Sequence, residues 1–294
     1  MRDPNVQSKT VQTAPPRPLL IVDGDSLAHR AYHGIRSKMR TADGSPTNAL
    51  VGMSTMLLRL AATHRPRTML VCWDTLTHAT YRHEQLPAYQ SGREFDDELV
   101  AQLDLMPELV QALCLPIAKE PGYEADDFLA AGARSETEHG GTTLVVTSDR
   151  DAFQLVSDQV TVMLPRKGVS ELERVTPADV EAKYGVKPGQ VPDFIALRGD
   201  SSDRIPGATG IGPVKAAAVL AEHGSLEATL AAGRFASEAD DLRLFLRIAT
   251  MQADAPIPAL PDAKPDVAGA EAWAVDSGFE RLASRLAEER ARID

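Results

Sequence analysis

Three aspartates follow short apolar segments of the sequence. They are Asp23, Asp74 and Asp149, which come after residues 19–22, 68–73 and 143–147. Short runs rich in Val, Ile and Leu, separated by helical patterns, are typical of buried parallel strands. In an open parallel sheet, ligands bind outside the carboxyl ends of the strands. The three aspartates are therefore predicted to share one site.

Six further acids occur in clusters. They are Glu124, Asp126 and Asp127 at a predicted helix start, Asp151 two residues after Asp149, and Asp200 and Asp203 on either side of Ser201-Ser202. Any one of them alone could be a helix cap or a solvated turn residue. Together with the three strand-end aspartates, the clusters favour a common function.

Nine carboxylates cannot all be ionised within a few ångströms of one another unaided. Like charges raise each other's pKa unless divalent cations neutralise them. The seven histidines show no paired spacing, which disfavours zinc, and an all-oxygen ligand set suits Mg²⁺ or Mn²⁺. Two such ions about 4 Å apart stabilise the attacking and leaving oxygens of a phosphoryl displacement. The acids therefore indicate phosphodiester hydrolysis, and no Ser or Cys constellation for a covalent nucleophile is evident.

Three glycines and a lysine precede an apolar helical run at 216–220. They are Gly207, Gly210, Gly212 and Lys215. Glycines before a helix let backbone N–H groups approach a phosphate, and the helix N-terminus favours the anion. No strand precedes this loop, so it is not a dinucleotide-binding fingerprint. The loop indicates a grip on nucleic-acid backbone without sequence readout; a simple helix-capping loop is the alternative.

The net charge of −11 argues, taken alone, against a nucleic-acid partner. Four basic residues nevertheless occur with no acid between them. They are Arg30, Arg36, Lys38 and Arg40. This cluster indicates either a DNA-binding patch or a solvated loop.

The segments that position these residues predict an α/β fold with a central, mostly parallel sheet and flanking helices. The predicted units are a disordered tail at 1–18, an α/β core at 19–175, a helical region at 176–254, and a linker with a C-terminal helix that packs on the body at 255–294. Helices are expected at 47–63 and 99–113, and another between Thr176-Pro177 and Gly185. Residues 75–98 have weak periodicity, which is typical of functional or mobile segments.

No apolar stretch approaches the roughly 20 residues that cross a bilayer, and the first residues lack the apolar core of a signal peptide. Cys72 and Cys114 lie in apolar runs. Both are expected to be buried, reduced thiols, and the protein is expected in the cytoplasm without membrane association.

The motifs together resemble those of the bacterial 5′→3′ exonuclease and flap endonuclease family, including the N-terminal nuclease domain of DNA polymerase I, here without a polymerase. The resemblance covers about 19–250 and is carried by Val22-Asp23-Gly24, Trp73-Asp74, Tyr81-Arg82-His83-Glu84, Gly122-Tyr123-Glu124-Ala125-Asp126-Asp127, Thr147-Ser148-Asp149-Arg150-Asp151, Gly199-Asp200-Ser201-Ser202-Asp203 and the stretch from Pro206 to Gly212. It implies a PIN-like nuclease fold, a helical arch at 75–98, and a helix–three-turn–helix DNA-binding motif at about 192–224.

The resemblance also implies roles for individual residues. One metal ion would be held by Asp23, Asp74, Glu124 and Asp126 with Asp127 close by, and the second by Asp149, Asp151, Asp200 and Asp203. The implied catalytic residues are Asp23, Asp126, Asp149, Arg82 and Arg93, and Gln90 and Arg93 would contact DNA from the arch. Two or three Mg²⁺ or Mn²⁺ ions are expected, with a K⁺ ion at the glycine loop. The partners would be 5′ flaps, nicked or overhanging duplexes and RNA–DNA primers, bound by a monomer.

The sequence departs from the family pattern at three of these positions. Gln90 follows Tyr89 where the family usually has Lys, Arg204 stands where Asn is usual, and Trp73 replaces Phe. Because Gln90 carries no charge, Arg93 is predicted to provide most of the phosphate clamping.

Two other functions remain open at this point. Asp23-Gly24-Asp25 after a strand also fits a phosphatase of the haloacid-dehalogenase type, which would leave the glycine loop and Asp200/Asp203 unexplained. A non-catalytic, structure-selective DNA-binding protein would require key acids to be missing, and all nine are present.

Overall fold

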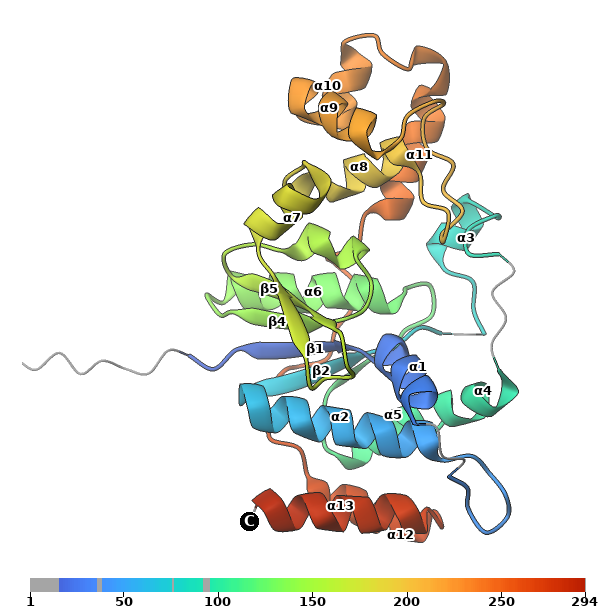
Figure 1. Ribbon diagram of the computed structural model, residues 1–294, viewed down its shortest axis with the longest axis vertical. Coiled ribbons are helices and arrows are strands. Elements are labelled where there is room, and N and C mark those ends of the chain that lie inside the picture. The colour runs from blue at the N-terminus through green and yellow to red at the C-terminus, as the bar shows by residue number, and fades with distance from the viewer. Residues whose placement is uncertain (1–15, 36–38, 76, 92–95, 294) are drawn as a thin grey trace, which may run out of the picture.

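Helices cover both faces of a central sheet, and a separate group of helices lies above it (Figure 1). The computed structural model describes residues 16–35, 39–75, 77–91 and 96–293. Most of the predicted tail, together with Arg36, Lys38 and Arg93, lies outside these described residues, and so does part of the segment at 75–98. The described elements fall into the sheet, the helices packed on it, and the upper helical region.

The sheet has six strands in the order β3-β2-β1-β4-β5-β6. The strands are β1 (Leu19–Asp23), β2 (Thr68–Cys72), β3 (Ile117–Ala118), β4 (Thr143–Val146), β5 (Val160–Pro165) and β6 (Leu172–Val175). All neighbours are parallel except β5 and β6, which pair antiparallel. The predicted strands are β1, β2 and β4, and all three are confirmed as neighbours at the centre of the sheet. Their side chains are buried on both faces, as continuous apolar runs require.

Two hydrophobic cores lie on opposite faces of the sheet. Helix α6 (Ala125–Glu138) covers one face, and its core continues into the upper helical region. The core of the other face is formed with α1 (Gly24–Gly34), α2 (Asn48–His64), α4 (Asp97–Leu103) and α5 (Met106–Ala112). The prediction of a single helix at 99–113 is wrong, since the structure has two helices there, α4 and α5. Pro107 lies in the first turn of α5, where proline is tolerated, whereas it would disrupt the interior of one continuous helix.

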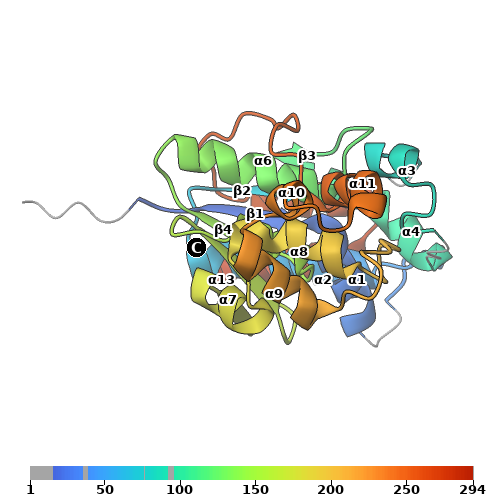
Figure 2. The same ribbon diagram turned by 90° about the horizontal axis from the view of Figure 1, so that it is seen from above.

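The upper region is all helical and covers the sheet when viewed from above (Figure 2). It consists of α7 (Pro177–Tyr184), α8 (Val191–Arg198), α9 (Pro213–His223), α10 (Leu226–Ala231) and α11 (Ala239–Ala249). Thr176 caps α7, Pro177 occupies its first turn, and Gly185 ends it with φ of 70°, so this predicted helix is confirmed. The short helix α3 (Tyr81–Gln85) packs on α11, whereas α4 packs on α1. The segment between α3 and α4 therefore connects the upper region to the helices under the sheet.

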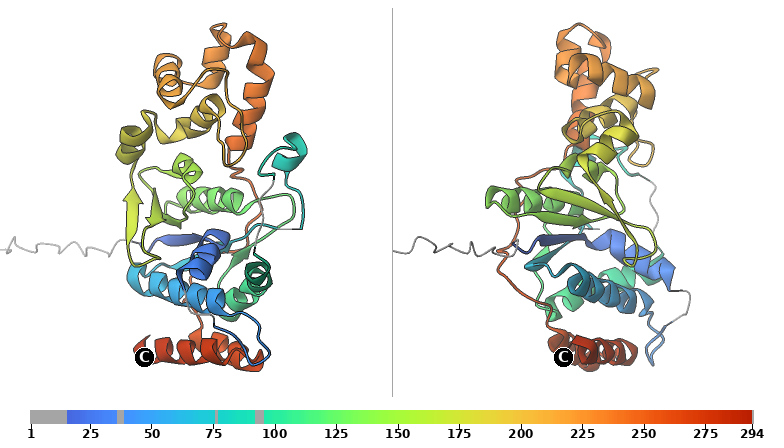
Figure 3. Two further views of the ribbon diagram at one scale, coloured as in Figure 1. Left: turned by 45° about the vertical axis from the view of Figure 1, so that its right-hand side comes forward. Right: turned by 60° about the vertical axis from the view of Figure 1, so that its left-hand side comes forward.

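Two helices end the chain, where one was predicted. Helices α12 (Val267–Asp276) and α13 (Glu280–Ile293) pack against each other, and α13 packs on α2 at the base of the molecule (Figure 3). Arg67 holds the preceding linker, because its guanidinium donates to the Leu260 carbonyl at 2.6 Å and also binds the carboxylate of Glu136.

The thiol of Cys72 is buried, but Cys114 is exposed, contrary to expectation. Cys114 follows α5 with φ of 54°, a left-handed turn conformation that carries its side chain out of the apolar run. No helix among the described residues is long and apolar enough to span a membrane.

Candidate active site

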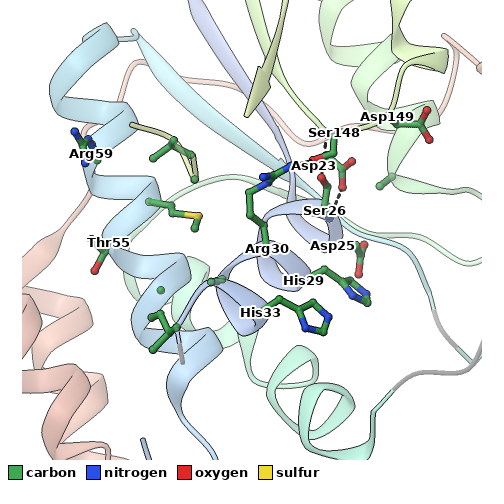
Figure 4. A pocket seen from close by; sticks show the side chains of 18 of the residues that line it. Asp23, Asp25, Ser26, His29, Arg30, His33, Thr55, Arg59, Ser148 and Asp149 are labelled. Atoms are coloured by element: carbon green, nitrogen blue, oxygen red, sulfur yellow. Dashed lines mark hydrogen bonds between the residues drawn. The ribbon is translucent and has the colours of Figure 1, made fainter. Parts of the chain in front are cut away.

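The acids gather around two adjoining cavities at the carboxyl ends of the central strands. The larger has a volume of about 1090 Å³ and includes Asp23, Asp74, Glu124, Asp126 and Asp149 in its lining. The second, of about 720 Å³, is lined by Asp23, Asp149, Asp151 and Asp200 among others. Figure 4 shows Asp23, Asp25 and Asp149 at one end of the larger cavity, with Thr55 and Arg59 of α2 at the other. Asp23 and Asp149 thus border both cavities.

Asp23 is the last residue of β1 and also caps α1. Its Oδ1 accepts a hydrogen bond from the Ser26 N–H at 2.9 Å, and its Oδ2 accepts one from the Thr147 hydroxyl at 2.6 Å. Burial raises the pKa of Asp23 to about 7, against the lowering effect of these hydrogen bonds, and the charges of Asp74 and Asp149 add to the increase. Strand pairing places β4 beside β1, which is why Thr147 reaches Asp23.

Asp74 is tied to two other elements. Its Oδ1 accepts from the Ala125 N–H at the start of α6 at 2.7 Å, and its own N–H donates to Asp25 Oδ2 at 2.7 Å. The pKa of Asp25 is raised well above its usual value, by burial first and then by the charge of Asp74. Asp25 is therefore a tenth acid of the site, and the sequence analysis considered it only for a phosphatase. Its position could have indicated this, because Asp25 lies in the first turn of α1, two residues after the cap residue Asp23.

Glu124 is oriented by two hydroxyl groups from the segment after β2. The Thr80 hydroxyl donates to Glu124 Oε1 at 2.9 Å, and the Tyr89 hydroxyl donates to Oε2 at 3.1 Å. Gln90 continues this chain, since its Nε2 donates to the Tyr89 hydroxyl at 2.8 Å and to Asp203 Oδ1 at 3.2 Å. Gln90 thereby links the two predicted metal-binding groups. Sequence reasoning missed Thr80 as a site residue.

The remaining acids repel one another. The pKa of Asp126 is raised well above its usual value by burial and then by Asp149 and Asp23. Burial raises the pKa of Asp151 to about 8, with further contributions from Asp149, Asp203 and Asp200. Asp149 therefore acts electrostatically on acids of both groups, on Asp23 and Asp126 of the first and on Asp151 of the second.

Asp200 and Asp203 lie in a tight turn after α8. The backbones of Asp200 and Ile205 exchange two hydrogen bonds of 2.8 Å, and Asp200 Oδ1 accepts from the Ser202 N–H at 2.9 Å. Burial raises the pKa of Asp200, but hydrogen bonds from Ser202 and the charge of Arg198 outweigh it, so the pKa is lowered. Arg198 Nη2 donates to Asp200 Oδ2 at 2.9 Å.

Asp127 and Arg82 form a buried ion pair, which differs from the roles expected for both. Arg82 Nη1 and Nη2 each donate to Asp127 at 2.8 Å, and the Gln252 and Glu124 N–H groups donate to Asp127 at 2.8 and 3.0 Å. Arg82 is 3% exposed and Asp127 is fully buried. With four donors on its two oxygens, Asp127 has no free lone pair facing the cavities, and Arg82 does not line either of them. In this conformation both residues also contact Glu124, through its N–H on Asp127 and through its Oε2, 3.4 Å from Arg82 Nη1.

The acids other than Asp127 suit hard divalent cations, since every candidate ligand atom is a carboxylate oxygen and several raise each other's pKa. Within the described ranges, no three of the Asp, Glu, His or Cys side chains converge closely enough to ligate one ion in this conformation. Several of their oxygens accept one hydrogen bond each from a protein donor, which leaves further lone pairs for an ion.

The glycine loop joins α8 to α9. Gly207 and Gly210 have φ of 74° and 73°, whereas Gly212 is extended. A Cβ on Gly207 would lie 2.4 Å from the Gly199 nitrogen, so only glycine fits where this loop meets the end of α8. The Lys215 ammonium donates to the Gly210 carbonyl at 2.9 Å.

Two residues of the basic cluster are described, and both side chains are engaged. Arg30 lines the larger cavity and donates to the Ser148 hydroxyl at 2.9 Å. Arg40 forms an ion pair with Glu98 and donates to the Gly44 carbonyl at 2.7 Å. Arg30 therefore faces the acids, and Arg40 braces the loop before α2 against α4.

Comparison with known proteins gives matches along most of the chain. Residues 18–185 match the family of the 5′-3′ exonuclease N-terminal resolvase-like domain, and residues 186–268 match the 5′-3′ exonuclease C-terminal SAM fold. DNA polymerase I of Mycobacterium tuberculosis is 45% identical over 210 residues, which cover 71% of this chain and 23% of the relative. The chain thus spans about a quarter of that relative's length.

Solved structures share the fold. The 5′-exonuclease of phage T5, with bound zinc, superposes with a TM-score of 0.66 at 20% identity, covering 92% of this chain and 98% of the other. The T5 flap endonuclease in a complex with DNA and metal ions gives a TM-score of 0.61 at 21% identity, with the same coverage. The predicted fold class is confirmed: an α/β fold with a mostly parallel sheet, flanking helices and a C-terminal helical region.

Proposed function

Because the chain belongs to the 5′-3′ exonuclease family, we propose that it is a structure-selective, sequence-nonspecific 5′ nuclease. It hydrolyses DNA phosphodiesters as a 5′→3′ exonuclease and a 5′-flap endonuclease in DNA replication and repair. The observation that carries this proposal is the gathering of acids from β1, β2, α6, β4 and the turn after α8 around two adjoining cavities.

Two divalent cations, Mg²⁺ or Mn²⁺, are the proposed cofactors, with a third ion as a further option. Asp23, Asp74, Glu124 and Asp126 would hold one, and Asp149, Asp151, Asp200 and Asp203 the other. When bound, the ions polarise the phosphodiester and lower the pKa of the attacking water. The T5 flap endonuclease, which has the same fold, binds DNA and metal ions.

The chain's own residues orient the acids for this chemistry. Thr147 fixes Asp23, and Thr80 with Tyr89 fixes Glu124, which leaves the remaining lone pairs of these two cavity-lining carboxylates for a metal ion. Gln90 donates to Asp203 and to the Tyr89 hydroxyl, which in turn donates to Glu124. This fixes the distance between the acids proposed for the first ion and those proposed for the second. Arg30, at the cavity wall, is placed to meet a phosphate oxygen of the bound strand.

The glycine loop is the proposed grip on the duplex beside the cut. Its backbone N–H groups and Lys215 contact phosphates, which carry no sequence information. A K⁺ ion held by backbone carbonyls of this loop is also proposed; of these carbonyls, that of Gly210 accepts a hydrogen bond from Lys215. Arg93 of the arch stays proposed as the main phosphate clamp.

The proposed substrates are 5′ flaps, nicked or overhanging duplexes and RNA–DNA primers, and the proposed state is a monomer in the bacterial cytoplasm, near the nucleoid. The family matches do not favour the phosphatase alternative, which also leaves Asp200, Asp203 and the glycine loop without a role.

Cleavage of a 5′-labelled flap duplex in Mg²⁺, Mn²⁺ or Ca²⁺, beside an aryl phosphomonoester, tests the proposal. The expected result is release of labelled oligonucleotides and mononucleotides in Mg²⁺ and Mn²⁺, with no phosphate released from the monoester. Turnover of the monoester without cleavage of DNA would overturn it.

A further inference from the structure

Arg204 is an exposed arginine held in left-handed backbone. Its φ is 57°, in a region that non-glycine residues rarely adopt and that Asn and Gly adopt most readily. It stands at the end of the turn that Asp200 and Ile205 close with two backbone hydrogen bonds. The turn thus has a long cationic side chain at a backbone position that favours Asn or Gly. Residues in such sparsely populated backbone conformations concentrate at functional sites.

The turn lies between the two acidic cavities. Asp200, Ser201 and Ser202 line the smaller cavity. Asp203, next to Arg204, accepts hydrogen bonds from Gln90 at its backbone carbonyl (3.3 Å) and its side chain (3.2 Å). Gln90 lines the larger cavity. Position 204 is thus two residues from Ser202 of the smaller cavity and adjacent to Asp203, which Gln90 of the larger cavity contacts.

The guanidinium of Arg204 is not committed to these acids. Among the described residues, Arg204 has neither an ion pair nor a side-chain hydrogen bond, and the cation bonded to Asp200 is the neighbouring Arg198. An exposed fork of five N–H donors beside a phosphodiester-cleaving site is suited to bind a phosphate oxygen.

We propose that Arg204 binds a backbone phosphate of the DNA strand that enters the acidic site from the glycine loop. This inference rests on the proposed nuclease function and adds a substrate contact to it. The contact is electrostatic and independent of sequence, because it is made to phosphate. This contact would explain why an arginine occupies a left-handed backbone position that is unfavourable for it.

Arg204→Asn tests this inference, because Asn removes the charge and tolerates left-handed backbone better than Arg. The matched control is Arg65→Asn. Arg65 is also an exposed arginine with positive φ (46°), but it lies after α2 and before the amino end of β2, whereas the acids follow the carboxyl ends of the strands. Arg204→Lys keeps the charge without the planar fork. Two readouts are needed: binding of a 5′-flap duplex in Ca²⁺ as a function of salt, and single-turnover cleavage in Mg²⁺.

The expected result is that Arg204→Asn melts at or above the parent temperature, binds roughly 10-fold more weakly, and reduces the salt slope by about one. Arg204→Lys retains most of the slope, and Arg65→Asn changes neither binding nor cleavage. An unchanged slope in Arg204→Asn, or an equal loss in Arg65→Asn, overturns the inference. If the parent binds DNA but does not cleave it, the proposed function fails while the binding data still decide the role of Arg204. If the parent does not bind, both fail.

Discussion

Removing one partner of the Arg82–Asp127 ion pair is expected to destabilise the whole molecule. The pair connects three elements, because Arg82 lies in α3, Asp127 lies in α6, and Arg82 Nε also donates to the Ile248 carbonyl of α11 at 2.9 Å. Burial lowers the pKa of Arg82, but the hydrogen bonds to Asp127 and the charge of Glu124 raise it well above its usual value. Because an arginine guanidinium is not deprotonated in proteins, Arg82 stays charged when Asp127 is neutralised.

Asp127→Asn leaves the buried Arg82 guanidinium without its two-point carboxylate partner, and Glu124, whose Oε2 lies 3.4 Å from Nη1, compensates the charge only in part. Breaking a buried pair by removing one partner costs about 3–5 kcal/mol. For a chain of this size each kcal/mol lowers the melting temperature by about 2–4 °C, so a decrease of about 6–20 °C is expected. Arg82→Met should cost a similar amount, because it strands the Asp127 carboxylate.

Urea unfolding of both single variants and the double variant in EDTA measures this prediction. The double variant should be more stable than the sum of the singles by about 1–3 kcal/mol, which is the coupling of residues in direct contact. Glu138→Gln is the control, because it breaks an exposed pair with Arg134 and should change stability by less than about 1 kcal/mol. The reasoning is refuted if Asp127→Asn retains full stability without metal and instead raises the Mg²⁺ concentration needed for cleavage, as a metal ligand would.

Three further outcomes follow from the site. Asp126→Asn should abolish cleavage yet raise the melting temperature in EDTA, because burial and the neighbouring acids disfavour the ionised form of Asp126 at neutral pH. A lower melting temperature would argue against this repulsion between the acids. Gly207→Ala should lower the melting temperature and weaken DNA binding, since its Cβ would collide with the Gly199 backbone; parent-like behaviour of the variant would contradict that contact. Lys215→Ala should weaken binding equally for unrelated duplexes and reduce the salt slope by about one, and a sequence-dependent loss would contradict a backbone-only contact.

The sequence contained enough information for the fold class and for the location of the acids, because strand-end aspartates and apolar runs obey local rules. β1, β2 and β4 were predictable from continuous buried runs. β3 has two residues and β6 exposes half of its side chains, so neither carries the periodic signal of a buried strand.

The partners of each acid could not be predicted, because they depend on contacts between distant segments. Arg82 and Asp127 are 45 residues apart, and nothing in their local sequence distinguishes a buried ion pair from a catalytic cation and a metal ligand. Gln90 and Asp203 meet across 113 residues. Asp25 was visible in the sequence, but its hydrogen bond to the Asp74 backbone depends on how β1 and β2 pair.

The single-turnover rate of 5′-flap cleavage as a function of Mg²⁺ concentration tests the central claim most directly. The parent protein should show no cleavage in EDTA and a saturable increase with Mg²⁺. Asp149→Ala, which removes one of the two acids that border both cavities, should stay inactive at every concentration while still binding the flap. Cleavage that persists in EDTA, or an undiminished rate in Asp149→Ala, would contradict the account.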